Sequence, residues 1–191
     1  MQRQSTRLRE LLRRKTFLHM PSVYDPLGGR LVQSLGYEAA YVGGYVSGAA
    51  TAITEPQLTM SEQVGLAADV AQSISIPLIV DGGAGFGDAL HTMRLVRECI
   101  RAGIAGVHIE DQLYPKRAHY HKYVVHGVPV EEFVEKISFA CKQRDEADAP
   151  AAARPPALLQ LGERGDRGLA RRQDRLPDGV RGLPPPPRRR R

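Results

Sequence analysis

The stretch PLIVDGGAGFG, residues 77–87, runs through three apolar residues to Asp81 and then has four glycines within six positions. A short apolar run between proline and glycine is typical of a strand buried on both faces of a parallel sheet. The glycines that follow allow the backbone to turn tightly and to pass close to a neighbouring group. The stretch therefore predicts a buried strand that ends in a carboxylate beside an uncrowded loop.

The same order of elements repeats along residues 17–144. Apolar runs predict strands over residues 17–25, 39–44, 77–81 and 106–111, and each is followed by a segment with helical periodicity. Alternating strands and helices are typical of a parallel α/β sheet. The pattern fits either a doubly wound sheet or part of a (β/α)8 barrel. A dinucleotide-binding fingerprint is not indicated, because the glycine spacing in GGAGFG fails at its last position.

Local signals place the helix ends. Pro26 is expected to open the first of these helices and Gly36 to close it. Thr59 and Glu62 have the spacing of a capping box for a helix to about residue 73. Asp88 is expected to cap the next helix, which ends near Arg101. The last helix begins near Pro129 and carries its apolar residues on one face, namely Phe133, Ile137 and Ala140.

Composition separates residues 1–144 from residues 145–191. The chain has 191 residues and a formal net charge of +6. Residues 145–191 hold eleven arginines, seven acidic residues and eight of the fourteen prolines, without an aromatic residue. Such a segment buries too little apolar surface to offset its ordering entropy, so we expect it to be extended and solvated. The abrupt change suggests the hypothesis of a coding sequence read in a shifted frame.

Several classes of protein are disfavoured. No apolar run is long enough for a membrane span, and the arginine-rich start lacks the apolar region of a secretory signal, so we expect a cytoplasmic protein without membrane partners. The basic tail has no aromatic residue to stack on bases, so specific nucleic-acid recognition is not expected.

Three carboxylates are expected at one edge of the sheet. Asp81 and Glu110 end neighbouring predicted strands, and Glu55 lies in the loop after the strand before them. Loops at the carboxyl ends of parallel strands carry the chemistry in such folds. Hard oxygen ligands suit Mg²⁺. Each acid alone could instead cap a following helix, but two on adjacent strands favour a metal.

A second glycine cluster follows the predicted strand over residues 39–44. In YVGGYVSG, residues 41–48, successive amides unobstructed by side chains could hold a carboxylate or a phosphate. Glycine-rich turns are common, so this signal is weak by itself.

Longer motifs resemble a known family. YDPLGGRLVQSLGYEAAYVGG (residues 24–44), PLIVDGGAGFG and RAGIAGVHIEDQLYPKR (residues 101–117), with the spacing between them, resemble the isocitrate lyase and phosphoenolpyruvate mutase superfamily. Its short members include methylisocitrate lyases, oxaloacetate decarboxylases and carboxyvinyl-carboxyphosphonate phosphorylmutase. The likeness covers about residues 17–144.

The resemblance implies a (β/α)8 barrel, a homo-oligomer and a small anionic substrate. It implies Mg²⁺ held chiefly by Asp81, with Glu110 and Glu55 reaching it through water. The expected reaction is that of a lyase or decarboxylase on small 2-oxo or hydroxy dicarboxylic acids, through an enolate stabilised by the metal. A mutase that forms a phosphorus–carbon bond is the alternative. The residues implied to contact substrate are Lys116, on a closing loop, and the backbone of Val42, Gly43, Gly44 and Tyr45.

This chain departs from the family pattern at three points. Gly83 stands where members usually carry a second acid, and Ala118 stands where lyases carry the cysteine that acts as acid and base. Only about the first four βα units are present, without the fifth strand that carries an arginine of the active site. A chain with half a barrel is expected to turn over poorly, and an inactive remnant with a basic tail is the further alternative.

Overall fold

The computed structural model describes residues 3–14, 17–117, 126–146 and 157–158. The chain divides into two units, residues 1–159 and 160–191, and every described residue belongs to the first. The prediction that residues 145–191 are extended therefore falls almost entirely outside the described residues. The proposed boundary near residue 144 stays a prediction.

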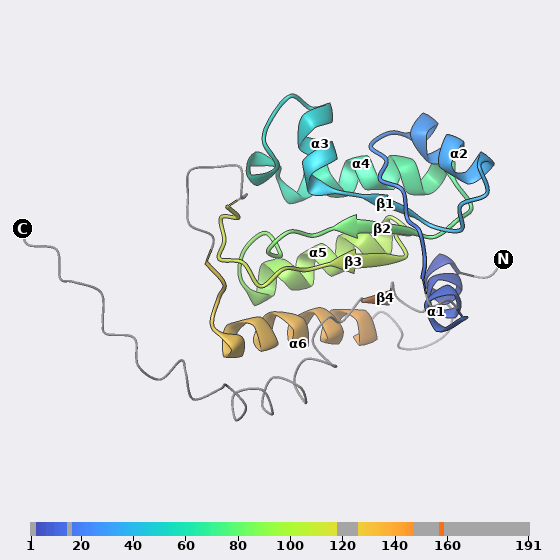
Figure 1. The fold of residues 1–191 in the computed structure, drawn as a ribbon. Coiled ribbons are helices and arrows are strands. Elements are labelled where there is room, and N and C mark those ends of the chain that lie inside the picture. Colours follow the sequence, from blue (N-terminus) through green and yellow to red (C-terminus); the bar gives the residue numbers. More distant parts are fainter. Residues whose placement is uncertain (1–2, 15–16, 118–125, 147–156, 159–191) are drawn as a thin grey trace, which may run out of the picture. The chain divides into compact units, whose positions relative to one another are not determined.

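Helices and strands alternate along the described chain, as Figure 1 shows. The strands are β1 (Ala40–Val42), β2 (Leu78–Asp81), β3 (Gly106–His108) and β4 (Ala157–Leu158). The helices are α1 (Gln4–Arg14), α2 (Pro26–Ser34), α3 (Gly44–Ala50), the 3-10 helix η1 (Glu55–Gln57), α4 (Met60–Ser73), α5 (Ala89–Arg101) and α6 (Val130–Glu146).

The four strands form one parallel sheet in the order β1-β2-β3-β4. The register places Val42 beside Val80 and Val80 beside Val107, so three valines form a row across the sheet. All three are fully buried. A parallel α/β sheet is the predicted fold class, and the predicted strands over residues 39–44, 77–81 and 106–111 are confirmed in shorter form.

Two differences from the expected strands concern the sheet edges. The predicted strand over residues 17–25 is reduced to an isolated bridge between Ser22 and Tyr41. Pro21 accepts a hydrogen bond from the Tyr41 N–H but has no N–H to donate, which limits the ladder there. At the other edge, β4 follows α6 and pairs with β3, although no fifth strand was expected.

The predicted helix caps are confirmed. The Thr59 hydroxyl accepts from the Glu62 N–H while the Glu62 carboxylate accepts from the Thr59 N–H. Asp88 accepts from the first-turn amides of α5, and Asp25 caps α2 just before Pro26. Gly36 has φ +83°, the left-handed conformation expected of a residue that closes a helix.

The main core lies between the sheet and its helices. It contains Val42, Val80 and Val107 from the strands and Leu95 and Ala140 from α5 and α6. Figure 1 shows α5 and α6 side by side, and these helices make the most extensive contact between elements in the described part. The predicted face of α6 is confirmed, since Phe133 and Ile137 also pack on this core. A smaller cluster is formed by Leu8, Ile79 and Ala105.

Helix α2 differs from the others because leucines on it are exposed. Leu27 and Leu31 of the helix and its C-cap residue Leu35 lie four residues apart and have 78%, 57% and 66% of their surface exposed. Helix α2 packs against α4. The described chain therefore leaves an apolar stripe on α2 uncovered.

This contrast gives a stability prediction. Leu95→Ala should lower the free energy of unfolding by about 2–5 kcal/mol, because Leu95 is fully buried in the main core and its removal leaves a cavity. Leu31→Ala should change it by less than about 0.5 kcal/mol, because the side chain is mostly exposed. Urea denaturation of both variants measures the difference, and equal losses would contradict this core.

Candidate active site

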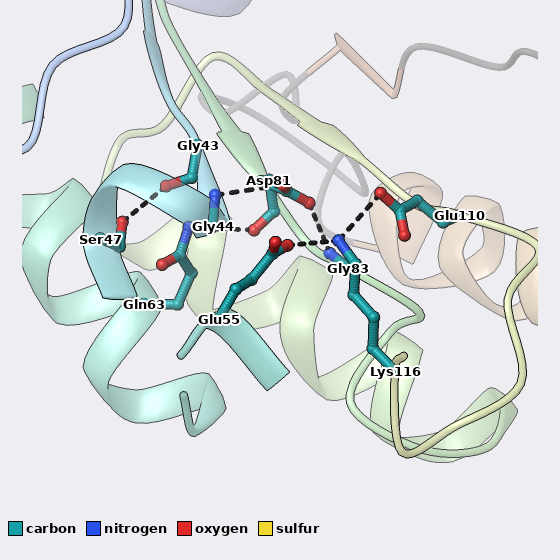
Figure 2. Close-up of polar contacts among 9 residues, drawn as sticks. All are labelled: Gly43, Gly44, Ser47, Glu55, Gln63, Asp81, Gly83, Glu110 and Lys116. Carbon is teal, nitrogen blue, oxygen red and sulfur yellow. Dashed lines mark hydrogen bonds and ion pairs between the residues drawn. The ribbon is translucent and has the colours of Figure 1, made fainter. Parts of the chain in front are cut away.

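Two acidic side chains contact one lysine at the carboxyl edge of the sheet, and a third acid lies nearby (Figure 2). Asp81 is the last residue of β2, and Glu110 lies two residues after β3. Glu55 opens η1, which follows α3. Lys116 lies on the segment after β3, six residues beyond Glu110. The structure thus places Asp81, Glu55 and Glu110 at this edge of the sheet, with Lys116 in contact with Glu55 and Glu110. The roles of these four residues stay a prediction.

Backbone amides orient the carboxylate of Asp81. The Gly44 N–H donates to Oδ2 at 3.1 Å, and the Gly83 N–H donates to Oδ1 at 2.8 Å. Gly83 has φ +49°, a conformation that favours glycine and turns its N–H back toward the strand end. Each carboxylate oxygen keeps further lone-pair capacity after one such bond. The acid is therefore held in place without being saturated.

The glycine next to Asp81 is required by close packing. A Cβ atom on Gly82 would lie 2.6 Å from the carbonyl oxygen of His108 and 2.7 Å from a methyl carbon of Leu95. The Gly82 N–H donates to that same His108 oxygen at 2.9 Å. β2 and β3 can therefore approach this closely only where Gly82 has no side chain.

Lys116 bridges two of the acids. Its Nζ donates to Glu110 Oε1 at 3.0 Å and also contacts Glu55 Oε1. The Lys116 and Glu55 side chains are each only 12% exposed. An ammonium group in this position neutralises part of the charge that the three carboxylates bring together.

Burial and the neighbouring charges shift the pKa values of Glu110, Lys116 and Tyr41. Burial raises the pKa of Glu110 above its usual value, and the hydrogen bond and charge of Lys116 oppose this shift. Burial acts to lower the pKa of Lys116, but Asp81, Glu55 and Glu110 outweigh it and the pKa is raised. Burial also raises the pKa of the Tyr41 hydroxyl, and Asp81 adds to this effect. Lys116 is thus held as a cation and Tyr41 as a neutral phenol.

The four residues implied to bind a substrate carboxylate differ in burial and in hydrogen bonding. Val42 is buried in β1 and packs in the main core. Gly43 precedes α3, and its carbonyl oxygen accepts from Ser47 at 2.8 Å. The Gly44 N–H donates to Asp81 rather than facing open space, and the Tyr45 side chain is 64% exposed. Their role toward a substrate stays a prediction.

Part of the predicted site lies outside the described residues. Ala118, which replaces the family cysteine, and the neighbouring His119, Tyr120 and His121 fall there.

Sequence reasoning missed three residues beside the acids. Gln63, in the first turn of α4, donates from Nε2 to the Asp81 carbonyl oxygen at 3.2 Å. Tyr41 and His108 lie on β1 and β3, and their ring centroids are 5.4 Å apart. The register could have indicated His108, because it pairs with Asp81 across the sheet. No local signal marks Gln63.

The donor set fits a hard divalent cation. Carboxylate oxygens are the ligands that Mg²⁺ prefers, and Glu110 Oε2 is buried without a hydrogen-bond partner among the described residues. Within that part of the chain, however, no three acids, histidines or cysteines are close enough together to hold a metal as they stand. The Lys116 ammonium contacts Glu55 Oε1 and Glu110 Oε1, so it already neutralises part of the charge that such an ion would neutralise.

Comparison with known proteins identifies the family. The family described as phosphoenolpyruvate phosphomutase matches residues 8–178. The chain belongs to this family. The implied (β/α)8-barrel class is thereby confirmed, with the described sheet as part of it.

Relatives of the chain are enzymes of small acids by name. It is 35% identical to 2,3-dimethylmalate lyase of Eubacterium barkeri, over 87% of this chain and 58% of that protein. It is 36% identical to oxaloacetate decarboxylase of Paraburkholderia xenovorans (strain LB400), over 83% of this chain and 54% of that one.

A solved structure also matches this chain over about half of its own length. Phosphonopyruvate hydrolase in complex with oxalate and Mg²⁺ superposes with a TM-score of 0.69 and 25% identity, covering 82% of this chain and 51% of that one. The chain thus spans about half the length of the proteins that it matches.

The bridge made by Lys116 gives a prediction for the metal-free protein. Lys116→Met should lower the free energy of unfolding by about 1–3 kcal/mol at pH 7 in EDTA, because it leaves the buried Glu55 carboxylate and the partly buried Glu110 carboxylate without this donor. Adding Glu110→Gln to this variant should restore part of the loss. Urea denaturation of the single and double variants forms a double-mutant cycle, and strictly additive effects would contradict the bridge.

Proposed function

We propose that the chain carries the metal-binding part of a Mg²⁺-dependent lyase or decarboxylase that acts on small 2-oxo or hydroxy dicarboxylic acids. The observation that carries the proposal is that Glu55 and Glu110 both contact the Lys116 ammonium at the carboxyl edge of the sheet, with Asp81 near enough for its charge to act on the same ammonium. Two relatives named for such acids, and a superposing structure with oxalate and Mg²⁺, support it.

Each side chain has a distinct part in this proposal. Asp81, oriented by the Gly44 and Gly83 amides, would bind the cation most directly, and Glu55 and Glu110 would contact its water ligands. Bound Mg²⁺ would supply electrophilic stabilisation of negative charge on a substrate oxygen. Lys116, once separated from the acids, would pair with an anionic group of the substrate.

Decarboxylation of oxaloacetate is the simplest such reaction for this set of residues. The bond between the methylene carbon and its carboxylate breaks, carbon dioxide leaves, and the electron pair is delocalised onto the 2-oxo oxygen as an enolate. A proton from solvent then returns to carbon. No side chain has to take a proton from carbon, so the reaction tolerates Ala118 in place of the family cysteine.

A phosphomutase is the second candidate, because the matching family is described by that activity. It would use the same acids while a phosphoryl group moves between carbon and oxygen. A mutase would convert phosphonopyruvate into phosphoenolpyruvate, whereas a decarboxylase would release pyruvate and carbon dioxide from oxaloacetate, so assays with the two substrates distinguish the candidates.

The remaining predictions concern membranes, cellular location, oligomeric state and nucleic acid. The described chain has no helix that is long and apolar enough to cross a membrane. A cytoplasmic location, a homo-oligomer and the lack of a specific nucleic-acid partner remain predictions.

Replacing Asp81 tests the proposed function. Asp81→Asn should weaken Mn²⁺ binding, measured by electron paramagnetic resonance, by about tenfold or more. It should also abolish the Mg²⁺-dependent release of pyruvate from oxaloacetate that exceeds the rate with metal alone. Asp69→Asn makes the same change at an exposed position of α4 and should alter neither.

Two results would overturn this assignment. One is unchanged Mn²⁺ affinity in Asp81→Asn. The other is a wild-type chain that binds no Mn²⁺ at millimolar concentration while showing a cooperative unfolding transition.

A further inference from the structure

Gln63 is a buried polar residue directly behind the candidate site. It lies in the first turn of α4, whose N-terminal end is at the carboxyl edge of the sheet, and its side chain is 1% exposed. Its Nε2 donates to the main-chain oxygen of Asp81 at 3.2 Å, as Figure 2 shows. Gln63 thus holds the backbone of the residue whose carboxylate the Gly44 and Gly83 amides hold.

This contact fixes the orientation of the Gln63 amide. A carbonyl oxygen only accepts, so the group facing Asp81 O must be the NH₂ and not the side-chain oxygen. The Gln63 Oε1 atom therefore points away from the strand. It is fully buried and has no hydrogen-bond partner among the described residues.

A buried acceptor without a hydrogen bond loses its hydration and gains no partner in exchange. Beside Gln63 lies a cavity of about 30 Å³, whose wall includes Gly44, Glu55 and Asp81. A cavity of roughly 10–15 Å³ can hold one water if polar partners are present. The volume beside Gln63 is therefore sufficient for one O–H donor, and Glu55, Gln63 and Asp81 are polar residues in its lining.

We propose that Gln63 is a positioning residue whose Oε1 accepts a hydrogen bond from an O–H donor held in this cavity. The donor's second hydrogen is then available to a carboxylate in the cavity wall, Glu55 or Asp81. Gln63 thereby couples the end of β2 to the acids through one small molecule. Two sources share this chemistry: a structural water, and a water bound to a divalent cation, of which the second rests on the proposed function.

Crystals of the full chain grown in EDTA, and the same crystals soaked in Mn²⁺, separate the two sources. A structural water should give density within about 3.2 Å of Gln63 Oε1 in both crystals. A metal-bound water should appear there only after soaking and should also contact the Mn²⁺ peak. A cavity without density next to Oε1 in both crystals would overturn the proposal.

Two matched variants test the coupling to the acids. Gln63→Met keeps the length of the side chain but removes both the donor and the acceptor, and it should weaken Mn²⁺ binding by about tenfold. Gln33→Met makes the same change in α2, where the side chain accepts from the Ser75 N–H, and should leave Mn²⁺ binding unchanged.

Metal affinity and unfolding free energy are measured together on these variants. A loss of stability with unchanged Mn²⁺ affinity in Gln63→Met would show a purely structural role and overturn the coupling. If the wild-type chain binds no Mn²⁺, the proposed function fails, while the EDTA crystals still decide whether Gln63 holds a water.

Discussion

The contact on which the site depends is the pair of backbone N–H groups that hold the Asp81 carboxylate. One comes from Gly44, at the start of α3, and the other from Gly83, in the turn after β2. The connections that follow two neighbouring strands are therefore joined through a single acidic side chain. Because backbone donors have little freedom once their elements are formed, the orientation of Asp81 is set by the fold itself.

The charge around Asp81 sets the second constraint. Three carboxylates lie at the strand ends, and burial makes ionisation of Glu110 less favourable than in water. One ammonium group, that of Lys116, offsets part of this cost while contacting two of the three acids. A cation beside the acids lowers the electrostatic cost of holding them together, and in the described chain the Lys116 ammonium does so.

Much of this arrangement could be predicted from the sequence, because its signals are local. The acid at the end of PLIVD, the capping box of Thr59 and Glu62, and the cap at Asp88 are each fixed by residues within a few positions. The helix α3 was not predicted, because its glycines are typical of a loop and only tertiary contacts make it helical. The role of Gln63 was equally hidden, since it arises from the placement of α4 against β2.

The positions of the acids do not depend on whether the barrel is closed. In a closed βα barrel each helix has a neighbouring helix on both sides. In the described chain, Leu27 and Leu31 of α2 and its C-cap residue Leu35 are exposed, so one side of α2 has no neighbour among the described residues. The sheet beside β1 likewise continues only as a bridge at Ser22. The acids, in contrast, are positioned by β2, η1 and the segments after β2 and β3, all of which are present. The metal binding that we propose would therefore use only elements that the described chain contains, whereas enclosing a substrate would also require a surface beyond α2.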